Sequence, residues 1–561
     1  MTILRTLPVR AAALALLTGS LTLGAVASPV RAAPYHASVR PLTIADGIVS
    51  GSFNPFAPTP LDGTRAGIYE PLYIVSYVNN STVTPWLATA YTYSKDLKTL
   101  TFTIRQGVHW SDGQPLTARD VYYTLTAGKT QVAMNQGGLW GPNGLATSVT
   151  QSGQRVTIHF KQPEATGFAT LVNNVMIVPA HIWSTIKNPS AYPNAHPVGS
   201  GPFTEVRNYS PEHGYDIGKN THYWQAGKPQ FDTLRFSQFT GNIPIALALA
   251  AGQVDWFGGF IPNVQKDYVA HNPQYFHHFV TSHSLPNLLY FNTTAYPYSL
   301  PVFRKALSMA MNRQAYDTNA EYGNAPPSDS TGLSGQYPTW RDKSLPNTLT
   351  QYNPAAARAM LLKAGFTMRG GSLVDPKGHP VSFNLPVVAG FTDFVAINQI
   401  MAHDFNALGI QASVTPVAQF GDWYSKVQQG GYNVVLGFAS GGATPYDFYY
   451  NLLDSENYQP IGTAVTVGNN YARYHNPTVD RLLARFRATT DATQQHAIVD
   501  QLQRIFITDL PDVPVLIQGI QEDYDTQYYT GFPDARNLYA SPAFGANPTD
   551  RLLTLVTIKP R

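Results

Sequence analysis

The segment 397–438 constrains the fold more than any other part of the chain, because two kinds of secondary structure alternate along it. It begins with the apolar spacing of a helix (INQIMAHDFNALGI) and passes into the apolar–polar alternation of a strand (IQASVTPV). A second helix near Trp423 then leads to the apolar strand YNVVLGF. Helices and strands in this succession are typical of an α/β domain, in which helices flank a sheet.

Other segments have clear boundaries of their own. LKTLTFTIRQGVHW (97–110) predicts a strand, one face of which carries Leu100, Phe102 and Ile104. Thr117, with Asp120 three residues later, has the pattern of a capping box at the start of a helix. Two more helices are predicted within 353–366 and 476–491, each of which opens with Asn-Pro.

Composition excludes several classes of function. The 561 residues are enough for roughly three or four structural units with sizeable cores. There is no cysteine, which excludes disulfides, thiolate metal sites, cysteine nucleophiles and lipid attachment through a cysteine. The formal charge is only +3 and no long basic run occurs, so nucleic acid is not an expected partner.

The N-terminus has the pattern of a secretory signal. Arginines precede an apolar run, and Ala25-Val26-Ala27 follows it as a small-residue cleavage site. We expect cleavage after Ala27, with an alternative near Ala32 or Ala33. No later stretch reaches the roughly 18 apolar residues that a membrane span needs, so the expectation is an exported, soluble protein without a lipid anchor.

Signatures of catalysis and metal binding are weak. No G-x-S-x-G, H-E-x-x-H, G-x-x-x-x-G-K or G-x-G-x-x-G motif occurs. A glycosidase needs only two carboxylates, so a secreted glycosidase stays open as an alternative. The histidines at 271, 277, 278 and 283 match no tight ligand spacing. We expect them to be surface or packing residues, and we expect neither a metal nor a cofactor.

Six segments occur in a characteristic order along the chain: YEPLY (69–73), the long stretch 85–125, HPVGSGPFTEV (196–206), LALAAGQVDWFGG (247–259), 289–313 and VDRLLARFRATTD (479–491). Together they span nearly the whole chain after the signal. The set resembles the large extracytoplasmic solute-binding proteins of ABC importers, the oligopeptide, dipeptide and nickel class.

The resemblance implies an α/β, two-lobed periplasmic-binding-protein-like fold with an extra inserted domain and a ligand cleft between the lobes. The implied boundaries are 34–68, 196–284 and 515–561 for lobe I, 69–195 for the inserted domain and 285–514 for lobe II. It also implies a monomeric receptor without catalytic activity, which closes on a small-molecule ligand and is recognised by ABC permease subunits in the periplasm.

The ligand is a separate question. Peptide-binding relatives typically carry an aspartate shortly after the strand that corresponds to YNVVLGF (432–438), where it pairs with the ligand's ammonium group. Here residues 440–444 read SGGAT, and the first carboxylate is Asp447. A buried ammonium without a partner is costly, so peptides are disfavoured unless Asp447 replaces the missing anchor. SGGATPYDFYY and the segment 531–544 look more like the oligosaccharide-binding branch, which favours a β-linked di- or trisaccharide. A peptide or nickel–chelate carrier stays open.

Ten residues are candidates for ligand contact: Trp423, Phe438, Ser440, Gly441, Tyr446 and Asp447 from lobe II, Phe53, Asn54 and Trp256 from the other side, and Asn287 near the junction. Aromatic rings would stack on sugar faces, and the polar groups would bond hydroxyls. For Phe53 and Trp256 the alternative is packing within a lobe. For Asp447 the alternative is capping a helix that begins near Phe448.

Overall fold

The computed structural model describes these parts of the chain: 40–46, 51–79, 81–141, 144–281, 283–545, 547 and 549–561. The predicted signal, 1–27, lies outside the described residues. Internal contacts divide the chain into Met1–Val39 and Arg40–Arg561, and the fold described below is that of the second unit.

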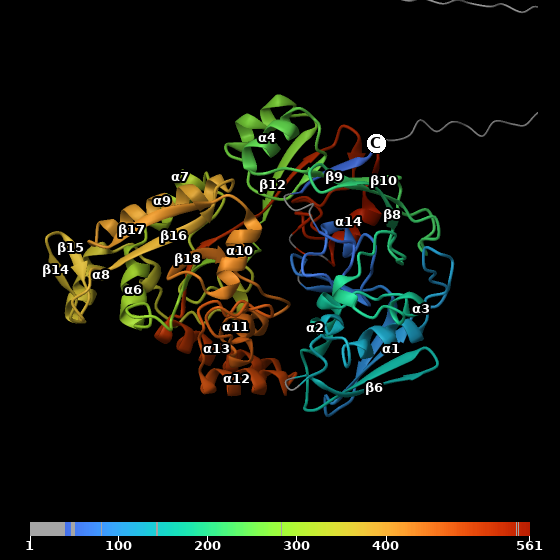
Figure 1. The fold of residues 1–561 in the computed structure, drawn as a ribbon, viewed down its shortest axis with the longest axis horizontal. Helices are drawn as coiled ribbons and strands as arrows, with labels where there is room; N and C mark the ends of the chain where they lie inside the picture. The colour runs from blue at the N-terminus through green and yellow to red at the C-terminus, as the bar shows by residue number, and fades with distance from the viewer. Residues whose placement is uncertain are drawn as a thin grey trace, which may run out of the picture. The chain divides into compact units, whose positions relative to one another are not determined.

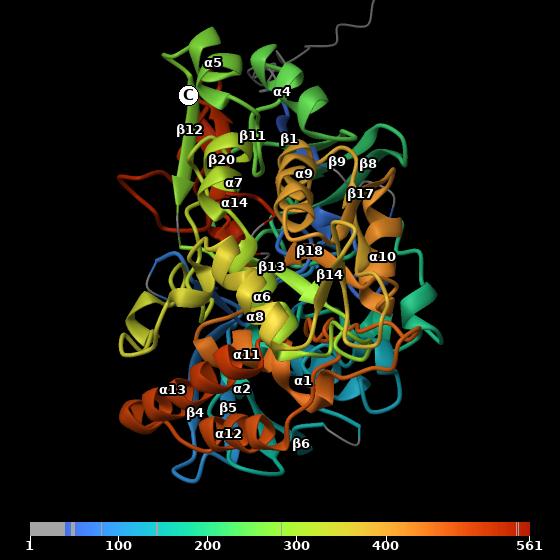
Figure 2. The same ribbon diagram turned by 90° about the vertical axis from the view of Figure 1, so that its left-hand side faces the viewer.

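A seven-stranded mixed sheet organises the part that we call the first lobe (Figures 1 and 2), with strands in the order β12-β20-β11-β1-β10-β9-β8. Strand β1 runs parallel to β10 and β11, and the other pairs are antiparallel. The strands are β1 (Leu42–Asp46), β8 (Phe203–Ser210), β9 (Gly214–Lys219), β10 (Thr233–Gln238), β11 (Trp256–Phe257), β12 (Phe276–Thr281) and β20 (Ile520–Asp525). The same lobe contains α4 (Asn242–Ala250), α5 (Val264–Asp267), α14 (Arg551–Thr557) and the short pair β21 (Tyr529–Thr530) and β22 (Lys559–Pro560).

A four-stranded antiparallel sheet, in the order β4-β5-β7-β6, forms a separate region. Its elements are β4 (Ala88–Tyr93), β5 (Thr99–Ile104), β6 (Ala146–Ser152), β7 (Arg155–Phe160), the pair β2 (Tyr73–Ser76) and β3 (Thr82–Pro85), and helices α1 (Ala118–Ala127), α2 (Gly167–Asn174) and α3 (Ala180–Trp183). The predicted face of β5 is confirmed, since Leu100, Phe102 and Ile104 are all buried. The capping box of Thr117 and Asp120 is confirmed at the start of α1.

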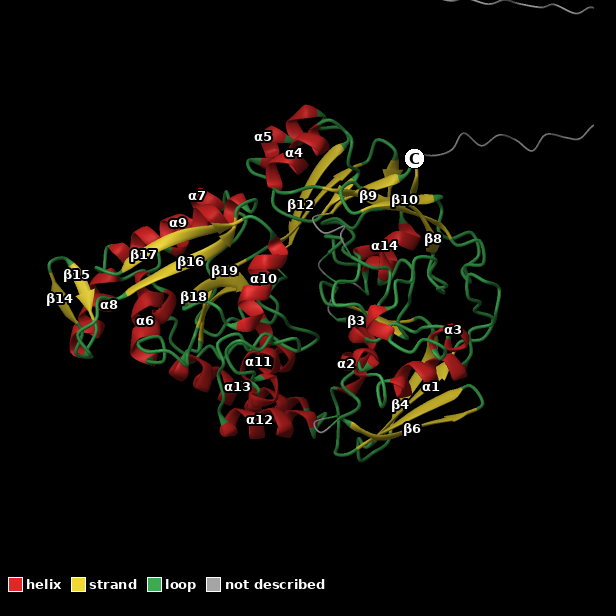
Figure 3. Cartoon of the chain, in the orientation of Figure 1, coloured by secondary structure: helices red, strands yellow, loops and turns green. Residues whose placement is uncertain are grey.

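We call the second region with its own sheets the second lobe (Figure 3). It contains a three-stranded antiparallel sheet, in the order β18-β13-β19, and a parallel pair of strands, β16 and β17. Its strands are β13 (Pro286–Phe291), β14 (Thr367–Arg369), β15 (Ser372–Val374), β16 (Ser382–Val388), β17 (Gln411–Val417), β18 (Val434–Phe438) and β19 (Asp512–Ile517). Its helices are α6 (Pro301–Ala310), α7 (Arg313–Ala320), α8 (Pro354–Lys363), α9 (Thr392–Asn406), α10 (Phe420–Gln429), α11 (Pro445–Leu453), α12 (Pro477–Arg487) and α13 (Ala492–Asp509).

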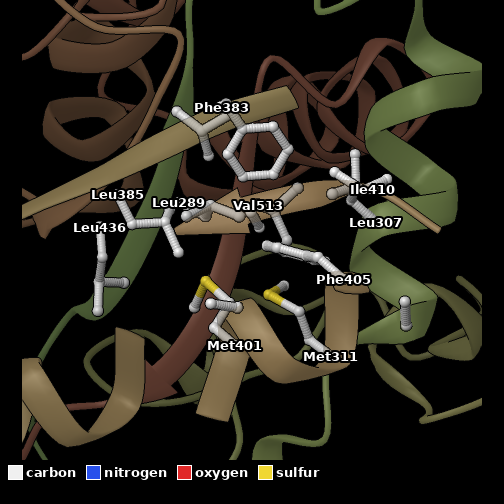
Figure 4. Packing of buried hydrophobic residues seen from close by; sticks show 14 of the residues in the cluster. Leu289, Leu307, Met311, Phe383, Leu385, Met401, Phe405, Ile410, Leu436 and Val513 are labelled. Carbon is white, nitrogen blue, oxygen red and sulfur yellow. The ribbon is translucent and has the colours of Figure 1, made fainter. Parts of the chain in front are cut away.

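One hydrophobic core joins the sheet and the helices of the second lobe. Figure 4 shows Leu289 of β13, Leu436 of β18 and Val513 of β19 beside Met401 and Phe405 of α9. All five side chains are almost fully buried. Because cores are packed as densely as crystals, this cluster holds β18 and α9 in defined positions relative to each other.

The predicted helices at 353–366 and 476–491 are confirmed as α8 and α12, and each has its asparagine as the N-cap. The helix expected from residue 397 begins earlier, at Thr392, because Phe394 also packs into the core.

Short 3₁₀ turns complete the structure at Asp62–Thr64, Val132–Met134, Pro189–Ala191, Val269–His271, Pro338–Trp340, Thr348–Thr350 and Ser455–Asn457. Of the helices in the described part of the chain, none has both the length and the apolar character that crossing a bilayer requires. The domain boundaries expected from the sequence stay a prediction.

Candidate functional site

A cavity of about 790 Å³ lies between the two lobes, and we call it the interlobe cavity. Its walls include the segments 238–242, 257–260, 283–287, 418–420, 438–441 and 518–521. Two of these, 283–287 and 518–521, belong to the connections through which the chain passes from one lobe to the other. The volume is within the range of about 300–1,000 Å³ that is common for small-molecule sites.

Phenylalanine rings from both lobes line the interlobe cavity: Phe239, Phe257 and Phe260 from the first lobe, and Phe391, Phe394, Phe420 and Phe438 from the second. Phe438, at the end of β18, is 36% exposed although it is a large apolar residue. Its ring centroid lies 5.0 Å from that of Phe394. Such rings offer flat apolar surfaces to a ligand.

The described lining contains three aspartates and one histidine, His283. Asp46, Asp393 and Asp550 belong to the described lining, whereas neither lysine nor arginine does. Burial raises the pKa of Asp550 to about 7, although the backbone N–H of Ser541 donates to this carboxyl at 2.9 Å. Burial also raises the pKa of Asp393. The cavity wall therefore offers no fixed positive charge to an anionic ligand.

The lining also contains neutral amide side chains. Asn287, Gln238 and Gln521 line the cavity, and each has a buried side-chain nitrogen or oxygen with no hydrogen-bond partner in the described structure. Asn287 and Gln521 are 2% and 4% exposed. Buried amides without a partner are uncommon in folded proteins and mark places where a ligand or water can bind.

The segment after β18 is held by hydrogen bonds that leave part of its backbone facing the cavity. The Tyr290 hydroxyl donates to the carbonyl of Phe438 at 2.7 Å, and Ser440 Oγ donates to Asn469 Oδ1 at 2.9 Å. A Cβ at Gly441 would lie 2.7 Å from the Tyr337 hydroxyl, so this position accepts only glycine without displacement.

Comparison with known proteins identifies the chain. Residues 82–460 match the family model described as bacterial extracellular solute-binding proteins, family 5 Middle. The chain belongs to this family. The resemblance seen in the sequence is thereby confirmed.

Family 5 relatives match over most of their length. The nickel-binding periplasmic protein of Escherichia coli (strain K12) is 26% identical over 487 residues, which cover 85% of this chain and 88% of the relative. The glutathione-binding protein GsiB of Salmonella paratyphi A is 26% identical over 472 residues, 80% of this chain and 82% of the relative.

A solved structure supports the fold. The periplasmic oligopeptide-binding protein of an oligopeptide ABC transporter from Thermotoga maritima, crystallised with mannohexaose, superposes with a TM-score of 0.83 at 24% identity. The match covers 93% of this chain and 99% of that one. The predicted α/β, two-lobed fold is confirmed.

Four of the ten candidate residues, Phe438, Ser440, Gly441 and Asn287, line the interlobe cavity. They come together because Asn287 of β13 pairs directly with Phe438 of β18. Their contact with ligand stays a prediction.

The remaining candidates from the second lobe lie outside the lining. Trp423 is 3% exposed, and its indole N–H donates to the carbonyl of Pro386 at 3.0 Å. Tyr446 is buried and stacks between Tyr450 and Phe486. Both rings belong to the hydrophobic core of the second lobe, where other side chains cover their apolar faces.

Asp447 is the N3 residue of a capping box whose N-cap is Thr444, and α11 begins at Pro445 rather than near Phe448. Burial raises the pKa of Asp447 to about 6. The capping alternative is therefore the one that the structure shows, with the helix starting three residues earlier than expected.

First-lobe candidates also have roles in packing. Phe53 is buried and makes edge contacts with the rings of Tyr209 and Tyr215. Asn54 is fully buried and donates to the carbonyl of Pro189 at 2.6 Å. The Trp256 indole donates to the carbonyl of Pro542 at 2.9 Å. None of the three belongs to the described lining of the interlobe cavity.

The histidine segment makes local contacts. His278 Nδ1 lies 2.8 Å from Asp523 Oδ1, and His277 Nε2 lies 2.8 Å from the Thr526 hydroxyl. No group of three or more histidine, aspartate or glutamate side chains among the described residues is arranged to hold a metal ion.

The sequence analysis missed most of the lining. Asn242, Phe391, Asp393 and Gln521 were not candidates, although all line the cavity. One available signal was AGFTDF at 389–394, where two phenylalanines and a carboxylate follow a glycine at the junction of a strand and a helix. Gln521 lies in the strand β20, where the sequence has no mark that separates it from its neighbours.

The role of Asp447 can be tested with Asp447→Ala. Loss of the cap should lower the free energy of unfolding by about 1 kcal/mol, measured by urea denaturation. Stabilisation by a bound ligand should be unchanged, because Asp447 lies outside the cavity lining. Asp120→Ala, in the same Thr-x-x-Asp capping box at α1, is the matched control and should also destabilise the fold. Wild-type stability together with lost ligand response would instead make Asp447 a ligand contact.

Proposed function

We propose that this protein is the substrate-binding receptor of an ABC importer whose ligand is a neutral oligosaccharide, a di- or trisaccharide. The receptor function follows from membership of the solute-binding family. The choice of ligand rests on the chemistry of the interlobe cavity.

The observation that carries the choice is the absence of lysine and arginine from the described lining. A peptide has a terminal carboxylate, and burying that charge without a positive partner is strongly unfavourable. The same argument disfavours glutathione, which has two carboxylates. A neutral sugar brings no charge that needs a partner.

The rest of the lining supports a sugar as well. Each hydroxyl both donates and accepts, so it can pair with amides of either orientation, such as those of Asn287, Gln238 and Gln521. The exposed ring of Phe438 offers a face to the C–H side of a pyranose. The Thermotoga maritima relative was crystallised with mannohexaose, which supports the same ligand class for this fold.

An oligopeptide is the second candidate, and Asp393 is the observation that favours it. This carboxylate lines the cavity and could pair with a ligand ammonium group. A peptide would then have a charged partner at its N-terminus only. We therefore rank the peptide below the sugar.

We propose no catalytic role. In this structure Asp393 accepts a hydrogen bond from Asn242 and Asp550 accepts one from Ser541, which gives both carboxylates a structural role. The signal pattern and the family support an exported carrier that delivers ligand to permease subunits, and we propose that it acts as a monomer.

Thermal unfolding against a ligand panel tests the ligand class. A ligand that binds only the folded state stabilises it by RT ln(1 + [L]/Kd), about 2.7 kcal/mol at a hundredfold excess over Kd. Cello-, xylo-, manno- and malto-oligosaccharides, di- to pentapeptides, and nickel with and without histidine form the panel. We expect a shift with one oligosaccharide series and none with peptides. A shift with peptides alone would reject the sugar, and turnover of chromogenic glycosides would reject the carrier.

Phe438→Ala should weaken binding of the responsive oligosaccharide five- to tenfold, about 1–1.4 kcal/mol, because a stacking face is lost. Isothermal titration calorimetry measures the change. Tyr352→Ala is the matched control, since Tyr352 is also an exposed ring, 50% accessible, but lies outside the described cavity lining. Equal affinity of both variants would remove Phe438 from the site.

The position of the N-terminus in the exported protein tests the predicted cleavage of the signal. If the signal pattern is processed after Ala27, mass spectrometry of protein recovered from the extracytoplasmic fraction should show a chain that starts at Ser28. A start at residue 33 or 34 would shift the site to Ala32 or Ala33, whereas an intact Met1 would argue against processing.

A further inference from the structure

The two lobes touch each other at the edge of the interlobe cavity, where α4 of the first lobe meets α9 of the second. The backbone N–H of Asn242 donates to the carbonyl of Gly390 at 3.2 Å. The Asn242 side-chain amide donates to Thr392 Oγ1 at 3.2 Å and to Asp393 Oδ1 at 3.1 Å. One residue of the first lobe is therefore bonded to three residues of the second.

Glycine on both sides makes this approach possible. A Cβ at Gly390 would lie 2.5 Å from the carbonyl oxygen of Thr240 and 3.1 Å from Cα of Gly241. A Cβ at Gly241 would lie 2.9 Å from the carbonyl oxygen of Gly390. Distances below 3.0 Å require a shift, and here the obstacle is backbone rather than a flexible side chain. The two backbones can meet only while both positions lack a side chain.

The obstacle at Gly390 lies entirely in the opposite lobe. All three nearest atoms to its added Cβ belong to Thr240 and Gly241. Gly390 also lacks the positive φ that would itself require glycine, whereas Gly241 has φ 155°. Alanine at 390 should therefore fit its own lobe and conflict only with the closed arrangement.

We propose that Thr240–Asn242 and Gly390–Asp393 form a glycine clasp, a contact that is made only when the lobes shut and that sets ligand affinity through closure. The inference rests on the proposed receptor function, because closure retains the ligand. Gly390 is the position that isolates the effect, since it lies outside the described lining while Thr240, Gly241, Asn242 and Asp393 lie within it.

Other contacts between the two sides of the molecule limit how far loss of the clasp can shift the equilibrium between the shut and open forms. The Ala165 N–H, from the region of the four-stranded sheet, donates to the Arg487 carbonyl of α12 at 2.7 Å. Phe260 of the first lobe stacks on Tyr322 of the second, with ring centroids 6.2 Å apart. Loss of the clasp should therefore shift the equilibrium toward the open form rather than prevent every contact. A ligand bound by both lobes loses affinity to the extent that the shut form is less populated.

The test uses the absence of cysteine from the chain. Asn242→Cys and Thr392→Cys place one thiol on each side of the clasp, at side chains that are now hydrogen-bonded. Dibromobimane, which becomes fluorescent when it joins two thiols, then reports how often the clasp forms, and no ligand is needed. Gly390→Ala is added to this pair. Gly421→Ala is the matched control, because a Cβ at Gly421 would meet nothing within 4 Å.

We expect cross-linking in the parent pair and in the Gly421→Ala variant at similar rates, and at least a fivefold lower rate with Gly390→Ala. The unliganded unfolding midpoint of Gly390→Ala, without the cysteines, should match that of the wild type. Equal cross-linking rates with and without Gly390→Ala would overturn the clasp, as would no cross-linking in the parent pair.

A binding measurement connects the clasp to capture. With mannohexaose and cellotriose as probes, Gly390→Ala should weaken binding at least tenfold, about 1.4 kcal/mol, while Gly421→Ala leaves it unchanged. Unchanged affinity despite slower cross-linking would overturn the link between clasp and affinity. Failure of both sugars to bind the wild type would reject the proposed ligand class, whereas the cross-linking result would still decide whether the clasp forms.

Discussion

The structure depends on the pairing of β13 with β18, which brings together parts of the chain about 150 residues apart. This antiparallel pairing sets Asn287 opposite Phe438 at one end of the sheet. The other edge of β13 pairs with β19, and the chain leaves β19 through 518–521 to enter the first lobe. The same three strands therefore build the core of the second lobe, position the aromatic end of the cavity and carry a connection between the lobes. A change in strand register would move all three features together, because a shift of one residue turns every side chain to the opposite face.

Burial shapes the chemistry of the cavity as much as the choice of residues does. Carboxyls that are taken out of water bind protons more tightly, and this raises the pKa of Asp550 to about 7. The wall is then less negative near neutral pH than its aspartates suggest, and no lysine or arginine of the described lining offsets them. Side-chain amides provide neutral polar groups in the wall, and phenylalanine rings provide flat apolar surfaces. A ligand that brings neither a net negative charge nor a need for strong ion pairing suits this environment best.

Two glycines at or beside the cavity leave no room for a side chain. Gly441 lies against the Tyr337 hydroxyl within the second lobe, and Gly390 lies against Thr240 of the first. The first contact shapes the cavity wall, whereas the second exists only between lobes. Since packed interfaces do not deform continuously, one methyl group at the second position acts on the equilibrium between open and shut forms rather than on the fold of either lobe.

Helices, strands and caps could be predicted from the sequence, whereas the residues that line the cavity mostly could not. The alternation of β5, the capping box of α1 and the Asn-Pro starts of α8 and α12 depend on residues close together in the chain, and the sequence determined them. The family was also recognisable, because its segments keep their order. Only the tertiary structure separated Phe438, which faces the cavity, from Trp423 and Trp256, whose indoles bond carbonyls inside their lobes. An aromatic ring has the same sequence signature in a core and in a ligand site. Which of the two it occupies is decided by strand pairing and packing between residues far apart in the chain, as is the contact of Gly390 with Thr240.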